Sequence, residues 1–393
     1  MQIEEFLRSL PLPKRYYGET FNICEKLNNE KTKYQKGLAA CIADEKANPM
    51  SKAINKAIRY AERKSEKVFR LLNSTLRQYE NADLKAAQEN FEQLMIVIKE
   101  NLFYATLFEE IKLSTEKGTF RIRIRRSRAN RFFRIRAVKA QDTRIENNAY
   151  ELFHIPVTKR QFISNERFSL SGFPTLYLAT ALPLAWQECG YPEKYYWSEF
   201  RCSELLGTDE SADNPLGKMR LLALYSPHEI AIWGMSLKYN EPELWIAVIR
   251  RYLAIYPLVL ACSFANANGG TPFKQEYIIP QMLMQWVYRH KRKCSGISYF
   301  SCMDDSTIPD KWNAYNIALP AVKPYDENGY SNKLQELFDW NKPRYYIAPT
   351  TNLQVSADDR KILNAFAEQE LSASKLPFAP RVYLKTALRC AKC

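Results

Sequence analysis

The first 115 residues carry apolar side chains at the mixed three- and four-residue spacing of amphipathic helices. One such run opens near Ser51 and continues to about Tyr79. A second run follows the turn and N-cap signal at Asn81–Asp83 and continues to about Ile111. Because amphipathic helices bury their apolar faces against each other, we expect these two helices to pack as an antiparallel hairpin.

After Gly118 the pattern changes to the two-residue alternation that is typical of strands. Apolar and basic residues alternate in residues 120–124 and again in residues 133–137, and the polar residues 127–130 lie between them. Two alternating runs joined by a short polar loop predict a β-hairpin with one strongly basic face.

Helices and strands intermingle along the rest of the chain. The predicted strands are residues 173–179, 219–225 and 296–301, and the predicted helices are residues 182–189, 242–256 and 278–290. A tail rich in proline and polar residues follows Pro320. We therefore predict the α+β class, with a helical domain over residues 1–116 and a mixed domain over residues 117–393 that ends in an extension from about residue 320.

Length and composition support this division and exclude several classes of protein. The chain has 393 residues, which favours two domains, and its 46% hydrophobic and 25% charged residues exclude wholesale disorder. The longest apolar stretch, residues 252–267, is broken by Pro257, so no membrane span is expected. The acidic start lacks a secretory signal and the nine cysteines are scattered, so a cytoplasmic protein with reduced thiols is expected.

The net charge of +14 indicates an anionic partner. Residues 117–136 contain nine basic residues and no acid. One interpretation is a hairpin that binds nucleic-acid phosphates, and a second is that one or two of these arginines bind the pyrophosphate of a dinucleotide. A third is a solvated sheet face whose arginines lie along apolar neighbours. The charge pattern alone leaves these three open.

Familiar motifs for cofactors and metals are missing from the sequence. It has no G-x-G-x-x-G, no P-loop, no G-x-S-x-G elbow and no H-E-x-x-H. The three histidines are dispersed, and the terminal pair Cys390 and Cys393 has no second pair to complete a metal site. We expect no metal and no Rossmann-type cofactor domain.

Two segments carry candidate chemistry. Residues 166–189 combine Arg167, a tyrosine at a strand centre (Tyr177) and Glu188 in the following helix. A carboxylate among apolar helix residues is either a paired core charge or a site residue. In the second segment, Glu276 and Tyr277 precede a helix that starts near a proline, where free backbone N–H groups favour anions, although both could belong to the core.

Taken in order, these segments resemble the RES-domain family, which is named for its arginine, glutamate and serine, and in particular its longer members. The matching pieces are Phe133–Arg136, Glu151–Pro156, Glu166–Ser169, Gly172–Leu178, Trp186–Glu188, Tyr256–Ser263, Glu276–Gln281 and Gly296–Ser301. The resemblance covers about residues 118–303 and implies a fold similar to ADP-ribosyltransferases. It implies an enzyme that cleaves NAD, as a glycohydrolase, phosphorylase or ADP-ribosyltransferase, without a metal.

The resemblance also implies a role for each site residue. Arg134 matches the family arginine, with Arg121 as a rival because its local pattern is the same, and Glu188 matches the glutamate. The other residues of the implied NAD-binding set are Arg167, Ser169, Tyr177, Glu276 and Tyr277. The last two stand where the family has its serine, which leaves the reaction type and the acceptor of the ADP-ribosyl group open.

Two functions therefore follow from the sequence. The first is a cytoplasmic NAD-consuming toxin or phage-defence effector, because shorter relatives are toxins of toxin–antitoxin pairs. Its expected partners are NAD and an antitoxin or regulatory protein, with the helical domain regulating, forming homo-oligomers or binding a partner. The alternative is a nucleic-acid-binding protein that uses the basic segment 117–136 on a catalytically degenerate scaffold.

Overall fold

The structure is a computed structural model of the whole chain. It describes residues 1–10, 12–14, 21–42, 49–106, 110–115, 118–123, 131–202, 220–265, 272–290, 294–303 and 315–348. The predictions made on the terminal cysteine pair and on the basic residues between 124 and 130 lie outside these ranges.

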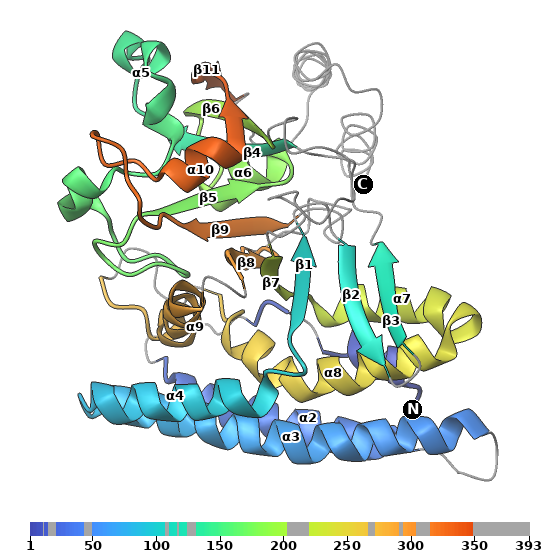
Figure 1. Cartoon of the computed structure of the whole chain (residues 1–393). Coiled ribbons are helices and arrows are strands. Elements are labelled where there is room, and N and C mark those ends of the chain that lie inside the picture. Colours follow the sequence, from blue (N-terminus) through green and yellow to red (C-terminus); the bar gives the residue numbers. More distant parts are fainter. Residues whose placement is uncertain are drawn as a thin grey trace, which may run out of the picture.

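Four helices come first: α1 (Ile3–Arg8), α2 (Ile23–Ala40), α3 (Pro49–Glu80) and α4 (Leu84–Ile98). The predicted hairpin of α3 and α4 is confirmed, since the two helices pack along each other and the Asp83 side chain caps α4 by accepting from the N–H of Ala86. Figure 1 shows α2, α3 and α4 as a layer along one side of the molecule.

The second helix was predicted to reach Ile111, which is wrong: α4 ends at Ile98 and the chain continues as strands β1 (Phe103–Thr106) and β2 (Glu110–Thr115). Buried and half-buried residues alternate along β1, which pairs antiparallel with a strand far along the chain. This partner, which short-range periodicity does not reveal, makes the segment a strand.

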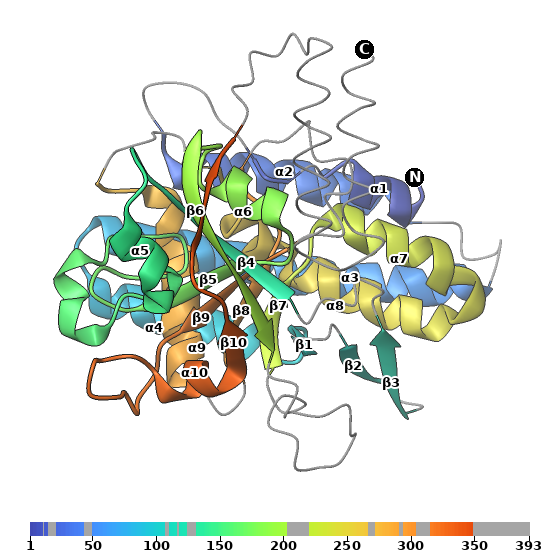
Figure 2. The same ribbon diagram turned by 90° about the horizontal axis from the view of Figure 1, so that it is seen from above.

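The described strands form one 11-stranded mixed sheet, in the order β10-β6-β4-β5-β9-β8-β7-β1-β2-β3 with β11 beside β6. Figure 2 shows β7, β1, β2 and β3 following one another toward one edge of this sheet. The remaining strands are β3 (Gly118–Arg123), β4 (Arg131–Ala137), β5 (Thr175–Ala179), β6 (Lys194–Cys202), β7 (Arg220–Leu224), β8 (Gly296–Tyr299), β9 (Asn316–Pro320), β10 (Phe338–Trp340) and β11 (Arg344–Ile347). Helices and a mixed sheet confirm the α+β class.

The helices that follow β4 connect the later strands. They are α5 (Thr143–Asn147), η1 (Ala149–Leu152), η2 (Val157–Phe162), α6 (Leu182–Glu188), α7 (Pro227–Asn240), α8 (Pro242–Ala261), η4 (Gln275–Tyr277), α9 (Ile278–Arg289) and α10 (Asn332–Leu337). Thus the helices predicted at 182–189, 242–256 and 278–290 are confirmed. The tail after Pro320 also contains two strands that were not predicted, β10 and β11, and both pair with β6.

The predicted basic hairpin is wrong. Strand β3 pairs with β2 at one edge of the sheet, whereas β4 pairs with β5 and β6 toward the other edge. Six strands stand between them in the sheet order, so Arg121 on β3 and Arg134 on β4 belong to distant strands. Alternation along the chain predicts that a segment is a strand, but it does not say which strand is its neighbour.

One continuous core joins the helical layer to the sheet. It includes α8 and α9, which lie between the helical layer and the strands (Figure 1). The hydroxyl of Tyr34 on α2 donates to the carbonyl of Leu253 on α8 at 2.6 Å, and its ring stacks on Tyr256 at 4.6 Å between centroids. The described residues on both sides of position 116 therefore share this core, and the domain boundary stays a prediction.

Helix α8 is long and apolar enough to cross a membrane, although no span was expected there. In this fold 78% of its most apolar window is buried by the rest of the chain. The core helix of a globular protein satisfies the same criteria of length and composition, so α8 gives little support for a membrane span.

Candidate active site

Strands β4 and β5 separate after a single bonded pair. Phe133 pairs with Ala179, and the described residues of these two strands form no second pair, whereas β4 follows β6 along its whole length. The carbonyl of Ile135 accepts a hydrogen bond from the Cys189 thiol at 3.3 Å. The sheet is therefore split beside Arg134, the residue that follows the last bonded pair.

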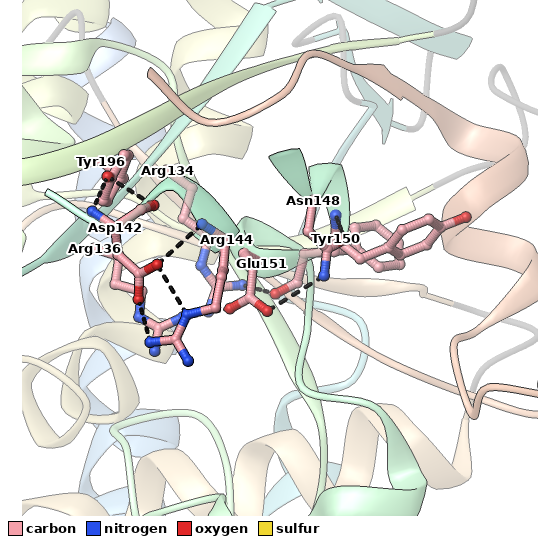
Figure 3. Close-up of polar contacts among 9 residues, drawn as sticks. Arg134, Arg136, Asp142, Arg144, Asn148, Tyr150, Glu151 and Tyr196 are labelled. Atoms are coloured by element: carbon pink, nitrogen blue, oxygen red, sulfur yellow. Dashed lines mark hydrogen bonds and ion pairs between the residues drawn. The ribbon is translucent and has the colours of Figure 1, made fainter. Parts of the chain in front are cut away.

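Arg134 is held at this split from the side of η1. Its Nη1 donates to the carbonyl of Phe153 at 3.1 Å, and Figure 3 shows it next to a polar network that continues to Arg136 and Glu151. Burial lowers the pKa of Arg134, and the neighbouring Cys189 and Tyr177 oppose this effect. Arg134 thus lies within electrostatic range of β5.

Glu188 is the last residue of α6, a short helix that packs Leu184 and Ala185 against β4 and β5. Its Oε1 accepts a hydrogen bond from Nδ2 of Asn316 on β9 at 2.7 Å, and its carboxylate is also hydrogen-bonded by the Ser301 side chain. Burial raises the pKa of Glu188, while these two hydrogen bonds and the charge of Arg167 act in the opposite direction.

Arg167 comes from the tight turn of residues 166–169, whose two ends bond each other through their backbones. Its Nη1 donates to the carbonyl of Cys262 at 3.2 Å, and its guanidinium carbon lies 4.9 Å from the centre of the Tyr277 ring. Burial lowers the pKa of Arg167, but the surrounding Cys302, Tyr277, Tyr299 and Glu188 outweigh it, and the net shift is upward.

Tyr177 fixes the same turn from β5. Its hydroxyl donates to Oγ of Ser169 at 3.0 Å and accepts from the N–H of Phe168 at 3.2 Å. The Gln281 amide on α9 donates to the carbonyls of Glu166 and Ser169 at 3.1 and 3.3 Å. Burial raises the pKa of Tyr177, which keeps the phenol protonated. Strand and helix together hold the loop that carries Arg167.

Glu276 and Tyr277 lie in η4, directly before α9, as the sequence predicted. Both are buried, with exposed fractions of 3% and 8%. Burial raises the pKa of Tyr277 to about 12, although Arg167 opposes the shift, and Nζ of Lys274 also faces its ring at 4.9 Å. Two cations therefore lie near the Tyr277 ring.

The structure brings four of the eight predicted site residues together with two others in one place, which we call the Glu188 cluster. Its members are Arg167, Tyr177, Glu188, Tyr277, Ser301 and Asn316. Ser169 supports it through Tyr177, and Glu276 adjoins Tyr277. Arg134 lies at the split beside the cluster, whereas Arg121 is on the strand at the other edge of the sheet. Of these two arginines, only Arg134 lies within electrostatic range of a cluster member, Tyr177.

Two members of the cluster were not predicted. Asn316 lies beyond the segment that carries the family resemblance, and it reaches Glu188 only because β9 pairs with β5. Ser301 belongs to a matching piece of sequence, but no local pattern assigned a function to it. Both contacts depend on strand order, which no local pattern in the sequence indicates.

The chemistry available here is that of a hydrogen-bonded carboxylate beside a guanidinium and aromatic rings. A carboxylate of this kind can hold sugar hydroxyls and stabilise a developing positive charge, and a guanidinium can bind phosphate oxygens. Among the described residues, no group of three or more His, Cys, Asp or Glu side chains could hold a metal ion.

The fold and the cluster define an α+β protein with a half-buried glutamate and arginine beside a split in a mixed sheet. No family model matches the chain, and no solved structure matches it. It is 30% identical, over 205 residues, to a protein of Bacillus subtilis (strain 168) named "Putative toxin YopC". The match covers 49% of this chain and 42% of that relative, so less than half of the relative is represented. The similarity is consistent with a toxin-like family.

Proposed function

We propose that this protein is a toxin that cleaves the bond between nicotinamide and ribose in NAD. The observation that carries the proposal is the Glu188 carboxylate, hydrogen-bonded by Asn316 and Ser301 and placed beside Arg167. The relative's name supports a toxin role in general terms, and the resemblance to RES domains supports the choice of NAD.

In this reaction the glycosidic bond breaks and its electron pair leaves with the nicotinamide nitrogen. The ribosyl carbon becomes oxocarbenium-like, and water, phosphate or a protein side chain then attacks it. The ionised Glu188 would stabilise the positive charge and accept hydrogen bonds from ribose hydroxyls. Its two donors, Asn316 and Ser301, favour the ionised form against the effect of burial.

The remaining residues would bind the substrate. Arg134, at the split, and Arg167 offer guanidinium forks to the pyrophosphate, since arginine pairs with phosphate oxygens in a bidentate manner. The rings of Tyr177 and Tyr277 offer surfaces for the nicotinamide. No residue of the set needs a metal for these roles, because cationic nicotinamide is already a good leaving group.

The test compares NAD turnover by the wild type, by Glu188→Gln and by the matched control Glu151→Gln. Glu151 is a carboxylate of the same chain that pairs with Arg136 at the surface. We expect nicotinamide release to fall about 10²–10³-fold in Glu188→Gln and to stay unchanged in the control. Parallel reactions with phosphate and with candidate protein acceptors identify the co-product.

The toxin part of the proposal has its own readout. Expression of the wild type in bacteria should arrest growth and deplete NAD, and Glu188→Gln should relieve both effects. Equal NAD cleavage by wild type and Glu188→Gln, or NAD left intact by soluble wild-type protein both in cells and in the purified reaction, would contradict the proposal.

A further inference from the structure

A cavity lies beside the turn of residues 166–169 and is lined in part by Ser169 and Leu170. Its volume is about 340 Å³, within the range of small-molecule sites. Its walls come from η2, the segment that leads into β5, α9 and the chain after β9. It therefore adjoins the Glu188 cluster without containing any of the six residues that define it.

Three cations and no acid line this cavity. Arg160 donates from Nε to the carbonyl of Gly172 at 3.1 Å, and Arg289 pairs with Glu92. Lys323 is exposed, and among the described residues the structure gives it no hydrogen-bond or ion-pair partner. The cavity consequently offers positive charge that the chain itself does not neutralise.

The backbone holds Arg160 in place. Gly172 has φ of +80°, a left-handed conformation that glycine adopts without strain, and in this conformation its carbonyl accepts the Arg160 hydrogen bond. The guanidinium of Arg160 lies 5.5 Å from the centre of the Phe173 ring. The remaining N–H groups of Arg160 are thus fixed beside an aromatic surface.

Apolar and aromatic groups make up most of the rest of the wall. The rings of Phe173 and Tyr288 are 47% and 38% exposed, which is unusual for side chains of this size, and Met284 and Pro320 complete the apolar floor. A ligand that satisfies both parts of the wall carries a negative charge at one end and a flat, largely apolar ring at the other.

We propose that this cavity is a binding site for a mononucleotide, with the phosphate on Lys323 and Arg160 and the base between Phe173 and Tyr288. A phosphate matches the guanidinium fork and the free ammonium, and a base supplies the ring. Inorganic phosphate alone would leave the aromatic surfaces unused, and an uncharged nucleoside would leave the cations unpaired.

The site is also connected to the Glu188 cluster. Ser169 and Gln281 line the cavity, and the same two residues bond Tyr177 and the turn that carries Arg167. A bound nucleotide would therefore contact the loop that positions Arg167. The binding itself does not depend on NAD cleavage, so it can be tested whether or not the proposed enzyme activity is correct.

The experiment measures binding of AMP to the full chain by calorimetry, with adenosine and inorganic phosphate as comparison ligands. We expect the dissociation constant for AMP to rise about tenfold or more in Lys323→Ala and in Arg160→Ala, because each loses a charge-assisted contact. Lys159→Ala is the matched control, since Lys159 is the exposed neighbour of Arg160 and does not line the cavity. Phe173→Ala should weaken the binding of AMP more than the binding of inorganic phosphate.

Three results would overturn the proposal: no AMP binding by the wild type, equal binding of AMP and inorganic phosphate, or equal losses in the control and in Lys323→Ala. Glu188→Gln separates this proposal from the previous one, because it should keep AMP binding. All the substituted cavity residues are exposed, so their variants should fold, which thermal unfolding verifies.

Discussion

Two groups of arginines and carboxylates lie in the part of the chain that follows β3, and they are built in different ways. What we call the β4 surface network is two sets of contacts within one short stretch of chain: Arg136 and Asn148 bond Glu151, and Arg144 bonds Asp142 (Figure 3). The Glu188 cluster draws its residues from α6, the turn before β5, β5 itself, η4 and the ends of β8 and β9. The first group is local in sequence, and the second exists only in the folded chain.

The two groups also differ in their exposure to solvent. The side chains of Arg144 and Arg136 are 89% and 51% exposed, so water competes for their partners and screens their charges. At Glu188, burial disfavours the ionised carboxylate, whereas the hydrogen bonds from Ser301 and Asn316 favour it. Charged groups in such surroundings interact strongly with what binds there, which makes the cluster, rather than the surface network, the candidate for chemistry.

The largest difference should follow from Arg167→Ala. It removes the hydrogen bond to Cys262 and the cation over the Tyr277 ring, and together these contacts are worth about 3 kcal/mol. We expect the free energy of unfolding in urea to fall by about that amount. Arg144→Ala, the exposed control, should change it by less than about 0.5 kcal/mol. Equal losses of unfolding free energy in the two variants would mean that the Glu188 cluster and the β4 surface network do not differ in this respect.

A smaller loss should follow from Asn316→Ala. This buried side chain donates to the Glu188 carboxylate at 2.7 Å, and a hydrogen bond to a charged group is worth about 2 kcal/mol. Since Asn316 holds the pKa of Glu188 down, the variant should also raise that pKa, which ¹³C NMR of the labelled carboxyl measures. An unchanged Glu188 pKa would mean that Asn316 is a packing residue only.

The sequence predicted what is local and missed what depends on strand order. Periodicity identified α3, α9 and the strand that carries Tyr177, and the helix that ends at Glu188 was predicted within one residue. The supposed hairpin of β3 and β4 was wrong, and the contact of Asn316 with Glu188 was invisible, because both depend on which strands become neighbours. Which strands pair with each other depends on the packing of the whole sheet. Local patterns in a single sequence do not reveal that packing.

Glu188→Gln should increase stability rather than reduce it. Burial raises the pKa of Glu188 in the folded chain above the ordinary 4.5 of the unfolded chain. At a pH between the unfolded and the folded pKa, the folded chain therefore holds a proton that the unfolded chain has lost. The free energy of unfolding therefore falls as pH rises through this window. The variant should be more stable than the wild type at pH 7, and the gain should shrink below about pH 4.5. Urea unfolding at both pH values measures it, and a gain that is the same at pH 4 and pH 7 would contradict the raised pKa.

The smallest effect should come from the β4 surface network. Arg136→Ala removes the ion pair with Glu151, whose atoms are 2.8 Å apart, but the two side chains are 51% and 35% exposed. Exposed pairs contribute about 0–1 kcal/mol, and added salt screens them. We therefore expect a loss of less than about 1 kcal/mol that disappears in 1 M NaCl. A larger, salt-independent loss would show that Arg136 also supports the neighbouring Arg134, and the network would then belong with the site rather than stand against it.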